Sequence, residues 1–160
     1  MRAKDMTHAD GGTLYLRTEE NTLKFEIVHT DSLGICMGGA EGEPITFYPI
    51  KLVNDGEPNM HNVAACAVLK NETINIPDAY TDEEFDFTGT RQFDKKTGYR
   101  SKSFLTVPMT NHESEIIGVL QLINAKDSKT GEIRTFSALD QQVVESLASQ
   151  AADRSTKKSF

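Results

Sequence analysis

The sequence predicts an α+β domain built on a β-sheet that is covered on both faces. Three observations support this prediction. Residues 13–29 alternate apolar and polar side chains on either side of a polar turn, as a β-hairpin does. Residues 103–110 and 115–124 form a second strand pair, and the later strand is apolar on both faces. Residues 135–152 then close the domain as a helix with an apolar stripe at helical spacing.

The composition bounds the class of protein. The chain has 160 residues and a mass of 17.7 kDa, which is the size of one domain. It shows no signal peptide and no apolar run long enough to span a bilayer, so we expect a cytoplasmic protein with no membrane partner. A formal net charge of −7 argues against a nucleic acid partner. Cys36 and Cys66 lack CxxC spacing and have small, apolar neighbours, which predicts buried, reduced thiols.

The N-terminal third is expected to hold part of a helix, the hairpin and a connection. Residues 1–9 are short and polar and are predicted to be part of an N-terminal helix. Residues 34–44 are rich in glycine, but no Gly-Lys-Ser/Thr follows, which excludes a phosphate-binding P-loop. This segment is therefore predicted to connect the hairpin to a strand at residues 47–53.

A short helix and an extended segment are predicted in the middle of the chain. Residues 61–69 consist mainly of small apolar residues, which allow close approach of another backbone or a flat ligand. Core packing alone also explains that composition. Residues 74–80 are predicted to be briefly extended, with Pro77 opening a turn or a short helix.

Gln121 is an amide within an otherwise apolar strand. Alternation along the strand places Gln121 on one face with Ile117, Val119 and Ile123, and leaves the other face to Ile116, Leu120 and Leu122. A buried amide without partners costs about 1–3 kcal/mol. Its partners are either neighbouring protein groups or a ligand, and the sequence leaves both alternatives open.

The closing helix is predicted to begin at a capping box, because Ser137 is followed three residues later by Asp140. Its apolar stripe offers more small and apolar surface than one sheet face needs, including Val144, Leu147, Ala148 and Ala151. We therefore predict a homodimer that forms through the terminal helices. Residues 153–160 are predicted to be a polar tail.

Residues 85–103 are a long polar stretch with no helical or strand period. Loops of this length inside compact domains are usually functional or disordered. Four aromatic residues argue against disorder, namely Phe85, Phe87, Phe93 and Tyr99. Five basic residues against two acidic ones fit either a solvated loop or a lid over an anionic ligand. In the lid interpretation, Arg100 is the basic residue most expected to be held in place, because it lies where the loop enters the next strand.

The sequence shows no catalytic or metal-binding constellation. The histidines have no metal-ligand spacing, and no GxSxG nucleophile motif occurs. We therefore expect no enzyme activity, no metal and no cofactor in this chain.

Three segments together resemble a GAF domain of the cyclic-nucleotide-phosphodiesterase type, which also occurs in bacterial signalling proteins. They are "NIPDAY", "FDKKTGYRSKSFLTVPM" and "IIGVLQLINA". The longer form of residues 85–101 is similar to GAF modules attached to bacterial HD-GYP-type phosphodiesterases, cyclases or receiver domains. The resemblance covers residues 10–152 and implies a six-stranded, mostly antiparallel sheet. Terminal helices would cover one face, and a small-molecule pocket under helices and loops would cover the other.

The resemblance also implies roles for particular residues. Asn124, Phe136 and Asp140 match the family's Asn-Lys…Phe-x-x-x-Asp-Glu signature, while Ala125 stands at the lysine and Lys126 is the candidate substitute as the partner of Asp140. In the ligand site, His29 and Gln121 fall at or near positions where the family has acidic residues. The candidate ligand-binding residues are Thr13, His29, Val63, Ala64, Phe85, Phe93, Asp94, Thr97, Arg100, Ser101 and Gln121.

The function expected from this resemblance is that of a sensory module. It would bind a small molecule, with a cyclic nucleotide or another anionic ligand as candidates, and would signal to an output domain outside this chain. The alternative is a structural dimerisation module with no ligand. A GAF enzyme of the methionine-sulfoxide-reductase type needs cysteines in the lid and a strand, which Cys36 and Cys66 do not supply. A bilin-binding GAF domain needs an attachment residue near the pocket helix, for which Cys66 is the candidate.

Overall fold

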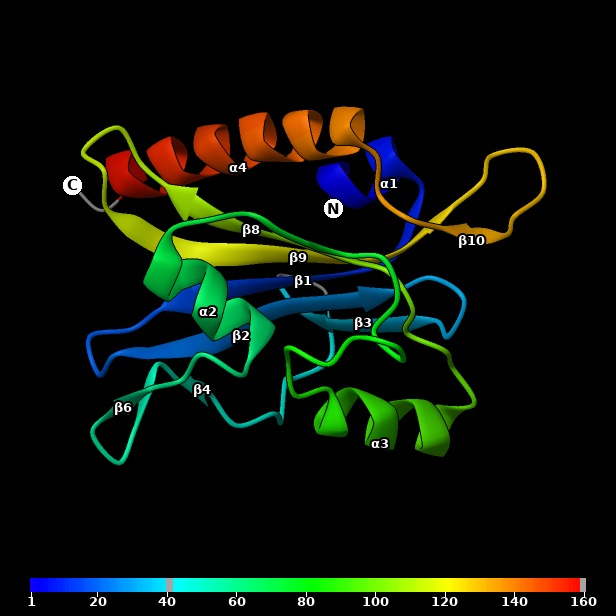
Figure 1. The fold of residues 1–160 in the computed structure, drawn as a ribbon. Helices are drawn as coiled ribbons and strands as arrows, with labels where there is room; N and C mark the ends of the chain where they lie inside the picture. The colour runs from blue at the N-terminus through cyan, green and yellow to red at the C-terminus, as the bar shows by residue number, and fades with distance from the viewer. Residues whose placement is uncertain (40–41, 159–160) are drawn as a thin grey trace.

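A computed structural model describes residues 1–39 and 42–158 of the chain. In this part, a single antiparallel sheet forms the centre of the molecule (Figure 1). Its main strands are β1 (Ala9–Arg17), β2 (Thr22–Thr30), β3 (Ile35–Gly38), β7 (Ile74–Ile76), β8 (Phe104–Thr110) and β9 (Ile116–Lys126). They follow the spatial order β3-β2-β1-β9-β8-β7, and β4 (Ile50–Lys51) and β10 (Ile133–Arg134) pair with β2 and β9. The predicted α+β class with a mostly antiparallel sheet is confirmed.

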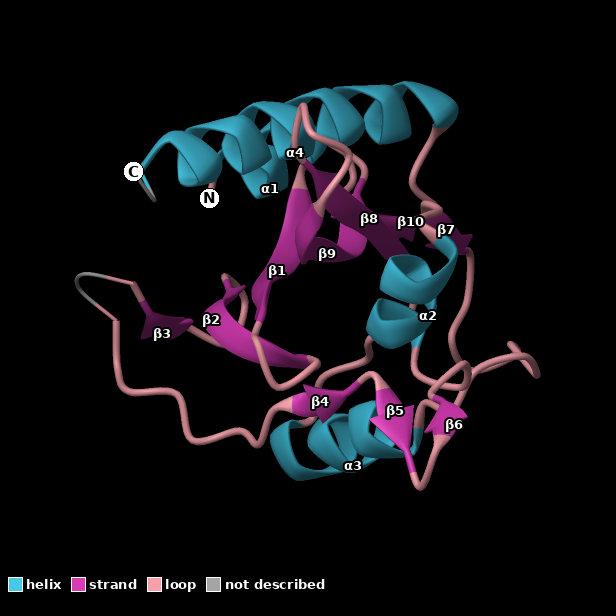
Figure 2. Cartoon of the chain, turned by 90° about the vertical axis from the view of Figure 1, so that its left-hand side faces the viewer, coloured by secondary structure: helices cyan, strands magenta, loops and turns pink. Residues whose placement is uncertain are grey.

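Helices cover both faces of this sheet, as the two-sided apolar strands predict. The helices α1 (Arg2–Thr7) and α4 (Ala138–Lys158) lie on one face. The helices α2 (Val63–Lys70) and α3 (Thr88–Thr97) lie on the side of the opposite face (Figure 2). A small hairpin of β5 (Val53–Asn54) and β6 (Glu57–Pro58) lies between β4 and α2.

The main core lies between α4 and the sheet. Leu105 and Leu122 have no exposed surface there, and Phe136 is 2% exposed. Each such side chain contributes about 1.5–3 kcal/mol when it is fully buried. Val144 and Ala148 also belong to this core. Their expected place on a dimer surface is therefore wrong, because the sheet already covers them.

A β-bulge changes the face assignment at the start of β9. The ladder pairs Met109 with Gly118 and Thr110 with Ile116, so Ile117 is an extra residue. Such a residue interrupts the alternation of side chains. As a result Ile117 packs against the α4 core and Ile116 packs against the core under α2, the reverse of the sequence prediction. From Gly118 onward the predicted alternation holds.

The capping box at the start of α4 is confirmed. Asp140 N–H donates to Ser137 Oγ at 3.0 Å, and Ser137 N–H donates to Asp140 Oδ2 at 2.8 Å. Arg134 Nη1 pairs with Asp140 Oδ2 at 2.7 Å. The proposed substitution by Lys126 is wrong, because its Nζ lies 3.1 Å from Asp10 Oδ1 instead.

Several predicted boundaries differ from the structure. The predicted connection at residues 34–44 contains the edge strand β3, and Ala40 and Glu41 within it lie outside the described residues. The predicted strand at residues 47–53 is reduced to β4 and the first residue of β5. The helix α4 continues to Lys158, so most of the predicted polar tail is helical and residues 159–160 lie outside the description.

The stretch 85–103 contains a helix, which corrects the prediction of a structureless loop. α3 spans ten residues and buries only Asp94 among its side chains. A helix that covers so little apolar surface lacks the apolar stripe by which helices are recognised in a sequence.

Both cysteines are free thiols, but their environments differ. Cys66 is buried in α2, as predicted, and burial raises the pKa of its thiol. Cys36 is exposed, which contradicts the prediction of burial. It lies on the edge strand β3, paired with His29 of β2, and its Sγ is 3.4 Å from the His29 Nε2.

Candidate functional site

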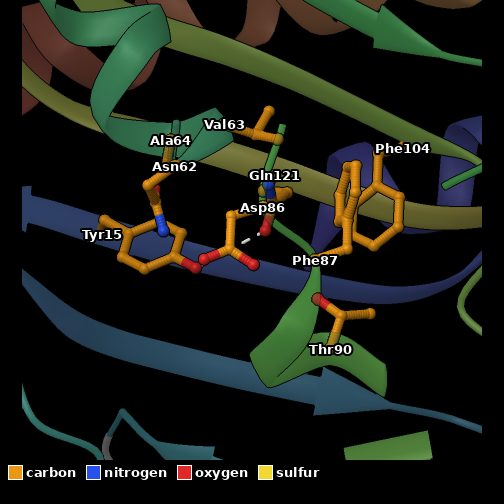
Figure 3. Close-up of a pocket in the computed structure, with 9 residues that line it drawn as sticks. All are labelled: Tyr15, Asn62, Val63, Ala64, Asp86, Phe87, Thr90, Phe104 and Gln121. Atoms are coloured by element: carbon orange, nitrogen blue, oxygen red, sulfur yellow. Dashed lines mark hydrogen bonds between the residues drawn. The ribbon is translucent and has the colours of Figure 1, made fainter. Parts of the chain in front are cut away.

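A small cavity lies between the sheet, the start of α2 and the start of α3 (Figure 3). Its volume is about 80 Å³. Five parts of the chain contribute its walls, and the lining residues are Tyr15, Asn62, Val63, Ala64, Asp86, Phe87, Thr90, Phe104 and Gln121. The site therefore combines residues that are up to 106 positions apart, as in the hydrogen bond between Tyr15 and Gln121.

The floor of the cavity is a polar row across three strands. Gln121 of β9 is paired in register with Thr13 of β1 and Thr106 of β8. The Gln121 amide Nε2 donates to Thr106 Oγ1 at 3.0 Å, and the Tyr15 hydroxyl lies 3.5 Å from the Gln121 Oε1. Burial raises the pKa of Tyr15, so its hydroxyl stays protonated and able to donate. The buried Gln121 amide thus has protein partners at both ends. The hydrogen bond to its oxygen is the longer and therefore the weaker of the two.

The start of α2 forms one wall. The Asn62 side chain caps this helix by accepting a hydrogen bond from Ala65 N–H at 3.1 Å. The first N–H groups of a helix have no partner within the helix. Val63 and Ala64 therefore present backbone donors beside the cavity, in a region where the helix dipole favours negative charge.

The segment 85–103, which we call the lid, forms the opposite wall. Phe87 is 5% exposed and packs on Phe104 of β8, with their ring centroids 5.3 Å apart. The buried Asp94 of α3 accepts hydrogen bonds from Ser101 N–H at 2.8 Å and Ser101 Oγ at 2.7 Å. It also accepts one from the Tyr80 hydroxyl, which raises the pKa of Tyr80. These contacts fasten α3 to the chain on both sides of it.

A second anchor joins the lid to the far end of the sheet. Tyr99 donates its hydroxyl hydrogen to Asp10 Oδ2 at 2.6 Å. Burial alone would raise the pKa of Asp10, but hydrogen bonds from Ser32, Tyr99 and Lys126 outweigh burial and lower it. The resulting buried carboxylate ties the lid to β1, the β2–β3 turn and β9 at once.

Three of the predicted ligand residues line the cavity. They are Val63, Ala64 and Gln121. Thr13 is buried next to Gln121 in the ladder but does not reach the lining.

The predicted lid residues lie inside the lid rather than facing the cavity. Asp94 and Ser101 bond to each other, and Thr97 Oγ1 donates to the Phe93 carbonyl at 2.8 Å. Phe93 itself packs edge-on against Tyr99, and Phe85 packs against the apolar cluster around Phe87. Arg100 is held as predicted, with its guanidinium carbon 4.1 Å from the centroid of the Tyr80 ring.

His29 lies outside the cavity. It pairs in register with Gly12, one residue before Thr13, and alternation turns its side chain to the α1 and α4 face. There it borders a second, larger groove. His29 therefore does not line this cavity, and its expected contact with a ligand stays a prediction.

Sequence reasoning missed six of the lining residues. They are Tyr15, Asn62, Asp86, Phe87, Thr90 and Phe104. Phe87 could have been recognised as a candidate, because it is an aromatic residue in a polar stretch. Asn62 directly precedes the small-residue helix, where a capping residue is expected.

The described residues contain no group of three or more His, Cys, Asp or Glu side chains that could hold a metal ion. Likewise, none of the helices within residues 1–39 and 42–158 has the length and apolar character that crossing a membrane requires.

The domain carries its terminal helices on one face of the sheet and a roofed cavity on the other (Figure 1). Comparison with known proteins identifies the family to which this arrangement belongs. The sequence pattern of the GAF domain matches residues 2–154. The chain belongs to the GAF domain family, whose members are sensory and regulatory modules.

The similar proteins of known sequence include phosphodiesterases. The chain is 46% identical over 74 residues, 46% of its length, to the dual 3',5'-cyclic-AMP and -GMP phosphodiesterase 11A of Takifugu rubripes, and covers 7% of that protein. It is 30% identical over 144 residues, 86% of its length, to the cGMP-specific 3',5'-cyclic phosphodiesterase of Drosophila melanogaster, and covers 11% of that protein. The chain thus spans about a tenth of the length of these relatives.

Solved structures share the fold. The GAF domain of a phosphoenolpyruvate-protein phosphotransferase from Coxiella burnetii aligns with a TM-score of 0.63 at 15% identity. That alignment covers 94% of this chain and 74% of the other.

Proposed function

We propose that this chain is a sensory GAF module that binds a small molecule in the cavity between α2, α3 and the sheet. A cyclic nucleotide is the leading candidate ligand. The observation that supports this most directly is the convergence of Val63, Ala64 and Gln121 on one roofed cavity. The phosphodiesterase relatives, whose printed names include cyclic GMP, support the choice of ligand.

The lid must move for such a ligand to enter. Ligand pockets usually have volumes of about 300–1,000 Å³, whereas the cavity measures about 80 Å³. α3 buries one side chain and is held by a few hydrogen bonds and ring contacts. Elements with so few buried apolar contacts open at low cost in free energy. We therefore infer that the structure represents a closed position of the lid.

The α2–β7 connection and β7 form hydrogen bonds that link the pocket helix to α4 and the residues just before it. Thr73 donates its hydroxyl hydrogen to Glu145 Oε2 at 2.7 Å, and Asn75 Nδ2 donates to the Phe136 carbonyl at 2.9 Å. A shift of α2 on ligand binding would therefore reach the start and the middle of α4. We propose that α4 passes this shift to an output domain outside the chain, and that the module itself is cytoplasmic, binds neither nucleic acid nor a membrane, and performs no catalysis.

A ligand panel in a thermal-shift assay tests the proposal. The panel contains cyclic mono- and dinucleotides, purines and small acids. A ligand at about 100 times its Kd adds about 2.7 kcal/mol of stability, which for a domain of this size raises the Tm by about 5–10 °C. Gln121→Met removes the amide of the floor and should abolish the shift, whereas Gln142→Met on α4 should preserve it. The absence of a shift from every compound would contradict ligand binding.

A structural dimerisation module remains the second candidate, because the larger hollow lies on the other face. This groove of about 480 Å³ runs between α1, α4 and the β1–β2 hairpin. Its apolar wall includes Leu14, Ile27, Leu147 and Ala151. We propose that a second copy covers it in a homodimer. Light scattering at tens of micromolar should give twice the chain mass, and Leu147→Glu should return the monomer mass.

A further inference from the structure

We propose that the hydrogen bond between Tyr99 of the lid and Asp10 of β1 is a latch, through which the position of the lid controls the order of α1 and its contact with α4. This inference rests on the lid movement in the proposed function. It adds a connection to the terminal helices that is separate from the one through β7, and it requires no particular ligand.

The latch lies at the end of the sheet where the chain leaves α3 for β8, beside α1 and the start of α4 (Figure 1). Asp10 is the second residue of β1, which follows α1 after a single capping residue, His8. Asp10 is 2% exposed, and the Tyr99 hydroxyl donates to its Oδ2 at 2.6 Å. The lid therefore bonds directly to the strand into which α1 leads.

The latch can open without leaving a buried charge unpaired. Lys126 of β9 places its Nζ 3.1 Å from Asp10 Oδ1, and this ion pair does not involve the lid. A buried carboxylate with no partner would be costly. Opening therefore removes the Tyr99 hydrogen bond, while Asp10 keeps its counter-ion.

The same carboxylate fixes the turn between β2 and β3. Ser32 N–H donates to Asp10 Oδ1 at 3.2 Å. Ser32 Oγ donates at 2.5 Å to Asp10 Oδ2, the oxygen that Tyr99 also reaches. Asp31 N–H donates to the Asp10 carbonyl at 2.8 Å. Because the turn and the lid share one carboxylate, release of Tyr99 loosens the turn.

Asp31 in turn holds a buried lysine of α1. Lys4 Nζ lies 2.6 Å from Asp31 Oδ2 and 3.2 Å from Asp5 Oδ1. Burial alone would lower the pKa of Lys4, but the hydrogen bonds to these two carboxylates outweigh burial and raise it. Lys4 is 4% exposed, and a lysine is almost never buried so fully without an ionic partner. A turn that moves takes the Asp31 carboxylate away from this ammonium group.

α1 is short enough to depend on this ion pair. It has six residues, and no side chain caps its N-terminus. Isolated helices of that length are not stable in water, so tertiary contacts keep α1 helical. Its last turn also joins α4, because Arg134 Nη2 donates to the Thr7 carbonyl at 3.3 Å and Arg134 Nη1 pairs with Asp140 at 2.7 Å. Loss of order in α1 therefore reaches the start of α4.

Hydrogen exchange of the chain without a ligand, measured by mass spectrometry, tests the latch. Tyr99→Phe removes the hydroxyl and keeps the ring. The amides of residues 5–8 in α1 and 31–34 in the turn should then exchange faster by about tenfold or more, the effect expected when a hydrogen bond to a charged group is lost. Ser32→Ala removes the next hydrogen bond toward α1 and should also speed the exchange of residues 5–8.

Tyr80→Phe is the matched control, because the Tyr80 hydroxyl bonds to Asp94 at the other anchor of the lid. It should speed exchange in the lid and leave residues 5–8 as in the wild type. Unchanged exchange of residues 5–8 in folded Tyr99→Phe or Ser32→Ala, verified by circular dichroism, would overturn the latch. Equal acceleration of residues 5–8 by Tyr80→Phe would also overturn it, because it would indicate a general loss of stability. Since no ligand is present, failure of the latch leaves ligand binding to the thermal-shift assay alone.

Discussion

At the scale of single residues, the lid depends on one buried carboxylate. Asp94 is 4% exposed and accepts hydrogen bonds from Tyr80 and from two groups of Ser101. The resemblance to the family pointed to Asp94 and Ser101 as ligand contacts. The structure gives each of them the other as partner, so in the closed state both hold the lid in place.

We predict that Asp94→Ala destabilises the domain. The change leaves the Ser101 N–H and the Tyr80 hydroxyl without their acceptor, and an unsatisfied buried group costs about 1–3 kcal/mol. The free energy of unfolding from urea titration should fall by at least that amount. Lys95→Ala, on the exposed side of the same helix, should change it by less than about 0.5 kcal/mol. Equal effects of the two changes would show that Asp94 does not anchor the lid.

At the scale of elements, the tight packing of β1 against β9 depends on a glycine. A Cβ added at Gly118 would lie 2.2 Å from the Tyr15 carbonyl oxygen, a backbone atom of the neighbouring strand that cannot easily give way. Gly118 also pairs with Met109 next to the bulge in β9. Glycine lowers the stability of a strand. It is present at position 118 because the backbones of β1 and β9 approach each other too closely there for a Cβ atom.

Gly118→Ala should therefore destabilise the domain by about 1–3 kcal/mol or more, the usual cost of overpacking. Gly89→Ala is the matched control, because a Cβ at Gly89 would meet no heavy atom within 4 Å. This change lies in α3 and should stabilise the domain by up to about 1 kcal/mol, since alanine favours a helix over glycine. Thermal unfolding of both variants measures the difference, and a Gly118→Ala variant as stable as the wild type would rule out the close approach.

Elements with a strong repeating pattern were predictable, and those without one were not. The hairpin, the strands around Gln121 and the capping box of α4 followed from alternation and spacing. β3 and α3 were missed, because β3 has four residues in a glycine-rich segment and α3 presents almost no apolar stripe. The bulge at Ile117 could not be predicted from the alternation of side chains in β9, because it arises from the pairing of β9 with β8.

At the scale of the whole molecule, the two faces of the sheet carry different structural features. The face under α1 and α4 holds the main core and the larger groove. The other face holds the small cavity, roofed by α2 and the lid. The cavity itself could be predicted only in part. Gln121 stood out as an amide among apolar residues, whereas Asp86 reaches the cavity only because the lid folds over β8.

The proposed coupling between the two faces of the sheet would act through two hydrogen bonds. The Thr73–Glu145 and Asn75–Phe136 hydrogen bonds join the segment after the pocket helix to α4. A ligand that orders α2 and the lid would thus bias the position of α4, provided that it binds the open and closed states with different affinities.

Hydrogen exchange measured by mass spectrometry tests whether the lid and α2 enclose a ligand site. The amides of residues 62–70 and 85–103 are followed with and without cyclic GMP at about 100 times its Kd, or at millimolar concentration if no Kd is measurable. Both segments should exchange more slowly with the nucleotide present, while the exchange of the exposed turn at residues 127–132 should stay unchanged. Identical exchange of both segments in the two samples would contradict the claim and leave the dimerisation module as the better account.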